Sequence, residues 1–168
     1  MKFGFKILKK DPKSLARAGI INTPHGKIKT PCFSPVATRA SVRSLSIDDL
    51  RQTKSQVVLA NTYHLFLKPG INTIKKFDGF GPFMGWHGPT ITDSGGYQVS
   101  FLWDKASEEV SVKKITDEGA YFKSYIDGAV HLLTPEKSMQ IQKILGADII
   151  MALDQPLGND FTPSLVKE

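Results

Sequence analysis

The chain has 168 residues, of which 40% are apolar and 23% charged, which excludes a disordered composition and allows a packed core. Its single cysteine, Cys32, excludes an internal disulfide, and no group of cysteines and histidines has the spacing of a zinc site. The net charge of +6 favours a polyanionic partner such as nucleic acid, but weakly, because the lysines are dispersed. No signal-peptide pattern and no apolar run of about 20 residues occurs, so we expect a cytoplasmic protein outside the membrane.

Short antiparallel strands are predicted at the start of the chain. The segments FKILKK (5–10) and GIINTPHGKIKTP (19–31) have strand character, and the second contains a Thr-Pro-His-Gly turn. A short extended segment, PCFSPVAT (31–38), follows, in which we expect Cys32 to be a small core residue. Ser46 then precedes IDDLRQT, whose two acidic residues in the first turn predict a capped helix start.

The middle of the chain alternates apolar runs with a helical pattern. The run QVVLAN (56–61) is continuous and apolar, as in a strand covered on both faces, and PTITD (89–93) is the next short strand. Between them, PGINTIKKF (69–77) begins with proline and spaces its apolar residues three apart, which predicts a helix.

An antiparallel insertion is predicted after the strand at 89–93. Residues 110–134 contain alternating segments broken by Glu-Gly and Asp-Gly pairs, and Asp-Gly is a strong hairpin signal. Thr134 then predicts the cap of a helix that has Pro135 at its first position and ends at Gly146. The run DIIMALD (148–154) has the pattern of another buried strand.

This order of elements predicts a parallel α/β sheet in a single domain over residues 1–168. Its four strands are expected near Phe33, Val58, Ile91 and Ile150. A closed eight-stranded barrel usually needs about 250 residues, so four strands form either an open sheet or the first half of a barrel. Polar residues follow three of the strands, at the end where α/β barrels keep their sites: Asn61, Asp93 and Asp154.

The turn after Asp93 carries the most informative residues. Two glycines in Ser94-Gly95-Gly96 permit a tight turn and a close approach of backbone to a ligand, with the ring of Tyr97 beside it. From the residues alone, Asp93 also fits a turn-stabilising aspartate, and Asp154 a helix cap. The two acids would also fit the paired carboxylates of a retaining glycosidase.

Four stretches together resemble the tRNA-guanine transglycosylase family of the bacterial type. They are TPCFSPVATRASVRSLS (30–46), NTYHLFLKPG (61–70), ITDSGGYQVSF (91–101) and the run from ITDEGAYFK to ADIIMALD (115–154). The resemblance covers only the N-terminal portion of such an enzyme. It implies a partial (β/α)8 TIM barrel: the first four βα units, an N-terminal antiparallel β segment and a β-hairpin insertion after the third strand.

The resemblance assigns a role to each polar strand end. Asp93 matches the general acid/base and proton acceptor, and Asn61 matches the residue that orients it by a hydrogen bond. Asp154 matches the residue that reads guanine, because an ionised carboxylate only accepts hydrogen bonds while guanine offers two adjacent donors. After Asp154 the chain departs from the family pattern, with Gln155-Pro156 in place of the usual Glu-Cys.

The resemblance also places the substrate base against the turn. Tyr97 is expected to stack on the base, and the floor under the base, with amides that bind its carbonyl oxygen, is expected from Ser94, Gly95 and Gly96. The remaining histidines and tryptophans are predicted to be structural: His64, His87, His131, Trp86 and Trp103.

The implied activity is a tRNA base exchange of queuosine biosynthesis, in which a 7-deazaguanine precursor replaces the wobble guanine of specific tRNAs. The implied partners are tRNA, guanine or the 7-deazaguanine base, and a second copy in a possible homodimer. The family's ribose-attacking aspartate and its zinc ligands lie further along, so we expect no cofactor in this chain and an inactive isolated chain. The alternative is a non-catalytic tRNA- or subunit-binding relative, or an inactive fragment.

Overall fold

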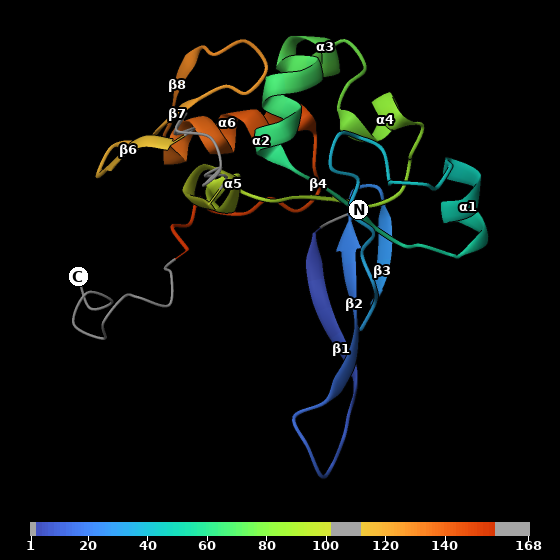
Figure 1. The fold of residues 1–168 in the computed structure, drawn as a ribbon. Coiled ribbons are helices and arrows are strands. Elements are labelled where there is room, and N and C mark those ends of the chain that lie inside the picture. The colour runs from blue at the N-terminus through green and yellow to red at the C-terminus, as the bar shows by residue number, and fades with distance from the viewer. Residues whose placement is uncertain (1–2, 102–111, 157–168) are drawn as a thin grey trace.

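A computed structural model describes residues 3–101 and 112–156. The strands of these residues form three sheets (Figure 1). The strands are β1 (Gly4–Lys10), β2 (Arg17–Thr23), β3 (Gly26–Thr30), β4 (Val58–Ala60), β5 (Thr90–Thr92), β6 (Val112–Thr116), β7 (Gly119–Lys123) and β8 (Val130–Leu133). The helices are α1 (Ile47–Gln52), α2 (Thr62–Leu65), the irregular π-helical turn η1 (Phe66–Gly70), α3 (Ile71–Lys75), α4 (Phe80–Met84), α5 (Gly96–Phe101) and α6 (Pro135–Leu145).

Four parallel segments form the central layer, as predicted. β4 and β5 pair in parallel, and single parallel bridges add Val36 beside Leu59 and Ile149 beside Ile91. The spatial order is therefore the Val36 segment, β4, β5 and the Ile149 segment. The first segment pairs at Val36, and Phe33, where we expected the strand, is 82% exposed.

The N-terminal strands form the predicted antiparallel sheet, β1-β2-β3. In Figure 1 this sheet extends away from the helices. The prediction for Cys32 was wrong, because its side chain is exposed. It lies between the end of β3 and the parallel bridge at Val36, where the chain crosses the surface and no described element covers it.

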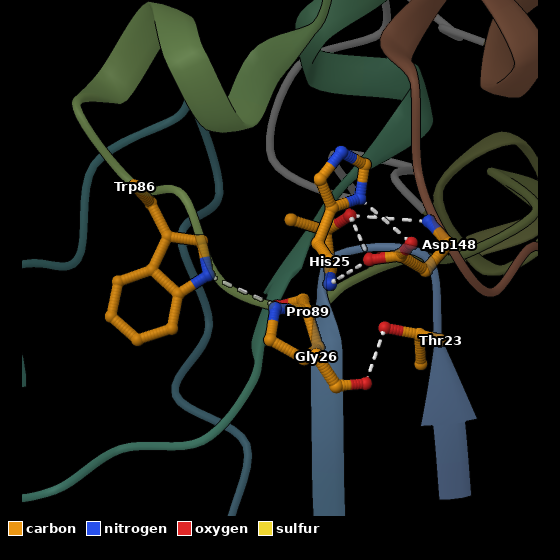
Figure 2. A network of polar contacts seen from close by, with 7 residues as sticks. Thr23, His25, Gly26, Trp86, Pro89 and Asp148 are labelled. Carbon is orange, nitrogen blue, oxygen red and sulfur yellow. Dashed lines mark hydrogen bonds and ion pairs between the residues drawn. The ribbon is translucent and has the colours of Figure 1, made fainter. Parts of the chain in front are cut away.

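A buried carboxylate ties the β2–β3 turn to the amino ends of two parallel segments (Figure 2). The side chain of Asp148 has no solvent exposure, and its two oxygens accept from His25 Nδ1 at 2.8 Å and from Thr90 N at 2.9 Å. Beside this network, Trp86 Nε1 donates to the carbonyl oxygen of Pro89 at 3.0 Å. These contacts hold the turn against the start of β5, at the end of the strands opposite Asp93.

The helix caps form as the sequence indicates. Ser46 and Asp49 make a reciprocal capping box at α1, in which each side chain accepts a hydrogen bond from the other residue's backbone nitrogen. Thr134 caps α6, and Gly146 ends it in the left-handed region at φ 71°. The helix predicted over 69–77 is shorter than expected: α3 begins at Ile71, because the preceding turn η1 contains a residue with non-helical backbone angles.

The insertion after β5 has three antiparallel strands, β6-β7-β8, rather than the hairpin we predicted. Residues 130–133 form the third strand by pairing with residues 120–123 of β7. Phe122 of β7 and Leu133 of β8 are buried in the main core, so the insertion is packed onto the parallel layer. Figure 1 shows it beside α6 and α5.

The prediction of a buried strand over 148–154 was wrong beyond its first residues. Only Ile149 makes a parallel bridge, and Met151 is 44% exposed. The physical reason lies in α6, where the fully buried side chain of Gln142 binds the Met151 backbone. Its Oε1 accepts from Met151 N at 2.9 Å, and its Nε2 donates to Met151 O at 2.8 Å. These groups are therefore paired with a side chain instead of a strand.

The core lies between the parallel layer and the helices. Its largest fully buried apolar members include Leu50, Val58, Leu65, Ile74, Phe80, Phe122, Leu133 and Leu145. Within the described ranges, no helix has both the length and the apolar character needed to span a bilayer.

Candidate functional site

Two polar side chains meet where β4 and β5 end. Asn61 follows β4 and Asp93 follows β5, and the backbone N–H of Asp93 donates to Ala60 O at 3.2 Å, which continues the strand pairing by one residue. The side-chain amide of Asn61 donates to Asp93 Oδ2 at 2.5 Å. The contact that we expected between Asn61 and Asp93 is therefore present in the structure.

The Asp93 carboxylate is held by two further donors. Thr62 N donates to Oδ1 at 2.7 Å, and Gln98 Nε2 donates to Oδ2 at 3.1 Å. An ionised carboxylate offers about four lone-pair positions, so these contacts leave one on Oδ1. The carboxylate is thus fixed in place and still able to accept a proton or a hydrogen bond.

The next residue, Ser94, connects the strand end to Asp154. Its hydroxyl donates to Asp154 Oδ1 at 2.5 Å and accepts from Gly96 N at 2.9 Å. Its carbonyl oxygen accepts from Ser138 Oγ of α6 at 2.6 Å. Because Ser94 is only 4% exposed, these bonds fix the position of the second carboxylate relative to the first.

The two glycines of the turn serve different purposes. Gly95 has φ 84°, a left-handed conformation that glycine adopts at little cost. A Cβ on Gly96 would lie 2.1 Å from the carbonyl oxygen of Asp154, so only glycine permits this approach. We expected the Gly96 amide to be available to a ligand, but that amide is already bonded to Ser94.

One cavity of about 380 Å³ lies between the two acids. Both acids line it, together with Tyr97 and Gln98 from α5. Tyr97 is 60% exposed, so much of its ring faces outward from the core. The complete lining is Asp93, Ser94, Gly95, Tyr97, Gln98, Met151, Ala152 and Asp154.

An aromatic and basic cluster adjoins Asp93 on the side of β4. The Tyr125 hydroxyl accepts from Arg39 Nη2 at 2.9 Å and lies 3.3 Å from His64 Nδ1. Burial, and then the charge of Arg39, lower the pKa of His64 below its usual 6.5, while Asp93 opposes this shift. Burial raises the pKa of the Tyr63 phenol to about 12, so it stays protonated at neutral pH.

Comparison with known proteins identifies the family of the chain. Residues 11–168 match the family model described as queuine tRNA-ribosyltransferase. The chain belongs to the queuine tRNA-ribosyltransferase family.

Curated relatives that carry that name include the following three proteins. The protein of Roseiflexus sp. (strain RS-1) is 47% identical over 167 residues, covering 92% of this chain and 42% of the relative. That of Halothermothrix orenii is 45% identical over 163 residues, covering 96% and 42%. That of Thermodesulfovibrio yellowstonii is 48% identical over 151 residues, covering 90% and 37%. The chain thus spans about two fifths of the length of these relatives.

In this member of the queuine tRNA-ribosyltransferase family, the structure brings most of the expected site residues to one cavity. Asn61 does not line the cavity but donates a hydrogen bond to Asp93, and the backbone of Gly96 lies close to the carbonyl oxygen of Asp154. The expected residues that line the cavity directly are Asp93, Ser94, Gly95, Tyr97 and Asp154. Their chemical roles remain predictions, which we develop below.

The sequence analysis missed several residues that build the site. Gln98 binds Asp93 through its amide nitrogen, and its Oε1 is buried with no hydrogen-bond partner in the described structure. Gln98 could have been found from its position, because it lies five residues after Asp93 in the first turn of α5, the helix that follows the glycine turn. Thr62, whose N–H binds Asp93, could have been found as the residue after Asn61.

Two of the other residues predicted to be structural, His131 and Trp86, have packed surroundings, whereas His87 does not. His131 packs its ring against Phe122 at 5.4 Å, and Trp86 is buried. His87 is exposed, and Trp103 lies outside the described residues. In the described part of the chain, no three His, Cys, Asp or Glu side chains are grouped so as to hold a metal ion. The zinc expected from the resemblance concerns positions further along and stays a prediction.

Proposed function

We propose that this chain binds a guanine-type base and supplies the proton-transfer group of a tRNA base exchange. In that reaction, the wobble guanine of specific tRNAs is replaced by a 7-deazaguanine precursor of queuosine. The observation that carries the proposal is that Asp93 and Asp154, which end two neighbouring parallel segments, line one cavity. Membership of the queuine tRNA-ribosyltransferase family supports the same activity.

Asp154 supplies base recognition in this proposal. Among the described residues, only Ser94 donates a hydrogen bond to it, on Oδ1, which leaves Oδ2 as an acceptor. Guanine presents two adjacent donors, N1–H and the 2-amino group, to a carboxylate that only accepts. Adenine presents an acceptor at N1, so it would face Asp154 with an unpaired lone pair and bind poorly.

Asp93 transfers protons in this proposal. The bond between ribose C1′ and guanine N9 breaks as the ribose-attacking aspartate implied by the family resemblance, which is not among the residues of this chain, bonds to C1′, and the departing base takes a proton from the Asp93 carboxylic acid. The incoming base then gives a proton to the Asp93 carboxylate as its nitrogen bonds to C1′ and the bond between C1′ and the attacking aspartate breaks, so both carboxyl groups end in their initial states. Asn61, Thr62 N and Gln98 hold the carboxylate at the cavity throughout.

The base would lie against the turn after β5. Tyr97, which lines the cavity and is 60% exposed, has a ring on which a purine can stack, an interaction worth about 1–3 kcal/mol. Gly95 places backbone without a side chain in the cavity wall, which lets a flat ring approach closely.

The finer architecture follows from the same proposal. The parallel order of the Val36 segment, β4, β5 and the Ile149 segment supports the first four βα units of a partial (β/α)8 barrel over residues 1–168. We also propose that the protein acts on tRNA in the cytoplasm. A second copy of the chain is its proposed protein partner.

Base binding by the 168-residue chain tests the recognition step. Calorimetry is expected to show binding of guanine and none of adenine. Asp154→Asn places donors opposite the guanine donors, so guanine affinity should fall on the order of 100-fold. Asp117→Asn, an exposed aspartate in the β6–β7 turn, is the matched control and should leave affinity unchanged. Equal guanine affinity of Asp154→Asn and wild type would remove Asp154 from the site.

Exchange of labelled guanine into tRNA tests the proton-transfer step. The assay uses a form of the protein whose wild type has been shown to exchange the base. Asp93→Asn keeps the shape of the side chain but cannot carry the proton, so exchange should be abolished while guanine binding persists. Exchange by this variant at wild-type rate would show that Asp93 is not the acid/base.

A further inference from the structure

We infer that Arg39, held by Tyr125, binds a backbone phosphate of the RNA strand at the rim of the base cavity. We call these two residues and His64 the rim cluster. This inference rests on the proposed function, because it assumes that the base in the cavity belongs to a polynucleotide. It adds a binding site for the sugar-phosphate chain that lies outside the cavity itself.

The first argument is position within the parallel layer. Arg39 comes three residues after the Val36 bridge, and His64 comes three residues after Asn61, so both follow the two segments on one side of β5. The base cavity lies on the other side, between the end of β5 and residues 151–154. A nucleotide whose base is in the cavity and whose glycosidic bond is at Asp93 therefore directs its sugar and phosphates toward the rim cluster.

The second argument is the chemistry of Arg39. Its side chain is exposed, and its guanidinium lies 5.7 Å from the centre of the Tyr125 ring while donating one hydrogen bond to the Tyr125 hydroxyl. A guanidinium has five N–H donors in a planar fork, so most of them remain for a ligand. Arginine in this form suits bidentate binding of a phosphate.

The third argument is that the cluster is rigid before any ligand binds. Tyr125 begins the β7–β8 turn, which is closed by backbone bonds from Ser124 N to Ala129 O at 2.8 Å and from Gly128 N to Ser124 O at 2.9 Å. The Tyr125 ring stacks on buried Tyr63 at 6.2 Å. A cation that is already oriented loses little conformational entropy on binding, which favours a specific contact over a mobile surface charge.

The rim cluster also joins three parts of the chain at the mouth of the site. Tyr125 brings the three-stranded insertion into contact with Arg39 and His64, which follow the first two parallel segments. The Tyr125 ring has Arg39 over it and Tyr63 stacked on it, and its remaining exposed part, 47% of the residue, can contact a ribose beside the phosphate. An exposed cation beside aromatic faces is the combination by which proteins bind single-stranded RNA.

The test measures the affinity of the chain for a short RNA stem-loop with one guanine in its loop, over a series of salt concentrations. Arg39→Gln should weaken binding about tenfold and reduce the slope of log affinity against log salt by roughly 0.7, the loss of one phosphate contact. Arg43→Gln is the matched control, because Arg43 is an exposed arginine four residues away that makes none of these contacts in the described structure. Arg39→Lys should recover part of the affinity and the full slope, since the charge returns without the fork.

Free guanine binding, measured on the same variants, separates the two proposals. Arg39→Gln should bind guanine as the wild type does. If the wild type binds guanine and RNA while Arg39→Gln matches Arg43→Gln in RNA affinity and slope, the phosphate site is overturned and the proposed function stands. A wild type that binds neither guanine nor RNA overturns both. Loss of self-association by Arg39→Gln with unchanged RNA affinity would assign the cluster to a protein contact and would also overturn the inference.

Discussion

The Ser94 hydroxyl donates a hydrogen bond of 2.5 Å to Asp154 Oδ1, and this bond joins the ends of two parallel segments. Asp154 is exposed and follows a segment that has almost no strand pairing of its own. Its position therefore depends on contacts made by residues elsewhere in the chain. Ser94, Gly96 and Gln142 supply these contacts, directly or through Met151, and each can be tested separately.

Ser94→Ala is expected to disorder the Asp154 carboxylate. The variant loses a bond to a charged acceptor and leaves the buried N–H of Gly96 without its partner, so the free energy of unfolding should fall by about 2 kcal/mol and guanine affinity by at least tenfold. The exposed pair Ser14–Asp11, also 2.5 Å apart, gives a matched control, because Ser14→Ala should change little. Urea denaturation and guanine calorimetry check both variants. If both lost the same free energy of unfolding, the burial of Ser94 would not explain the effect of Ser94→Ala.

Gly96→Ala tests the close approach of Asp154 to the turn. The new methyl would meet the Asp154 carbonyl oxygen at 2.1 Å, so the backbone must move and carry the carboxylate away from the cavity. We expect a loss of about 1–3 kcal/mol in stability together with weaker guanine binding. Gly4→Ala is the control, since nothing lies within 4 Å of a Cβ at Gly4. Unaltered guanine affinity in Gly96→Ala would show that the approach is not needed.

Gln142→Leu tests the side chain that replaces strand pairing for Met151. The substitution keeps an apolar contact but removes both bonds to the Met151 backbone and the bond from Thr92 Oγ1 at 2.9 Å. We expect the free energy of unfolding to fall by about 2–5 kcal/mol, since buried polar partners lose their bonds together. Gln140→Leu, on the exposed side of α6, should stay within about 0.5 kcal/mol of wild type in the same urea titration. A similar small change for Gln142→Leu would exclude this role.

The features of the fold and site that could be predicted from the sequence are those determined by a few adjacent residues. Strand ends at Asn61 and Asp93, the glycine turn and the caps at Ser46 and Thr134 are each set by a few adjacent residues, so spacing alone locates them. Their meeting at one edge follows because parallel neighbours end together. That relationship is confirmed by the pairing of β4 with β5.

The sequence-based predictions were wrong or incomplete where contacts between residues distant in sequence determine the structure. Residues 148–154 have the apolar pattern of a buried strand, and that pattern does not show that Gln142 binds Met151 in place of a neighbouring strand. Likewise, the apolar surroundings of Cys32 in the sequence gave no sign that the segment before Val36 crosses the surface. Gln98 was missed because a glutamine on a helix has no pattern of its own.

His64 should make the stability of the chain depend on pH in a way that a surface histidine does not. Its folded pKa is below the usual 6.5, chiefly because of burial, so below about pH 6.5 the unfolded chain binds more protons at this position than the folded chain. The free energy of unfolding therefore falls as pH decreases from about 6.5 to the folded pKa, and this loss is absent in His64→Gln. The stability of wild type minus that of His64→Gln, from urea titrations between about pH 7.5 and about pH 5, should decrease toward acid. His87→Gln, at an exposed position, is measured in parallel as the control for replacing a histidine with glutamine. A His64 difference that is flat, or that increases toward acid, would contradict the lowered pKa of His64 and the burial that chiefly causes it.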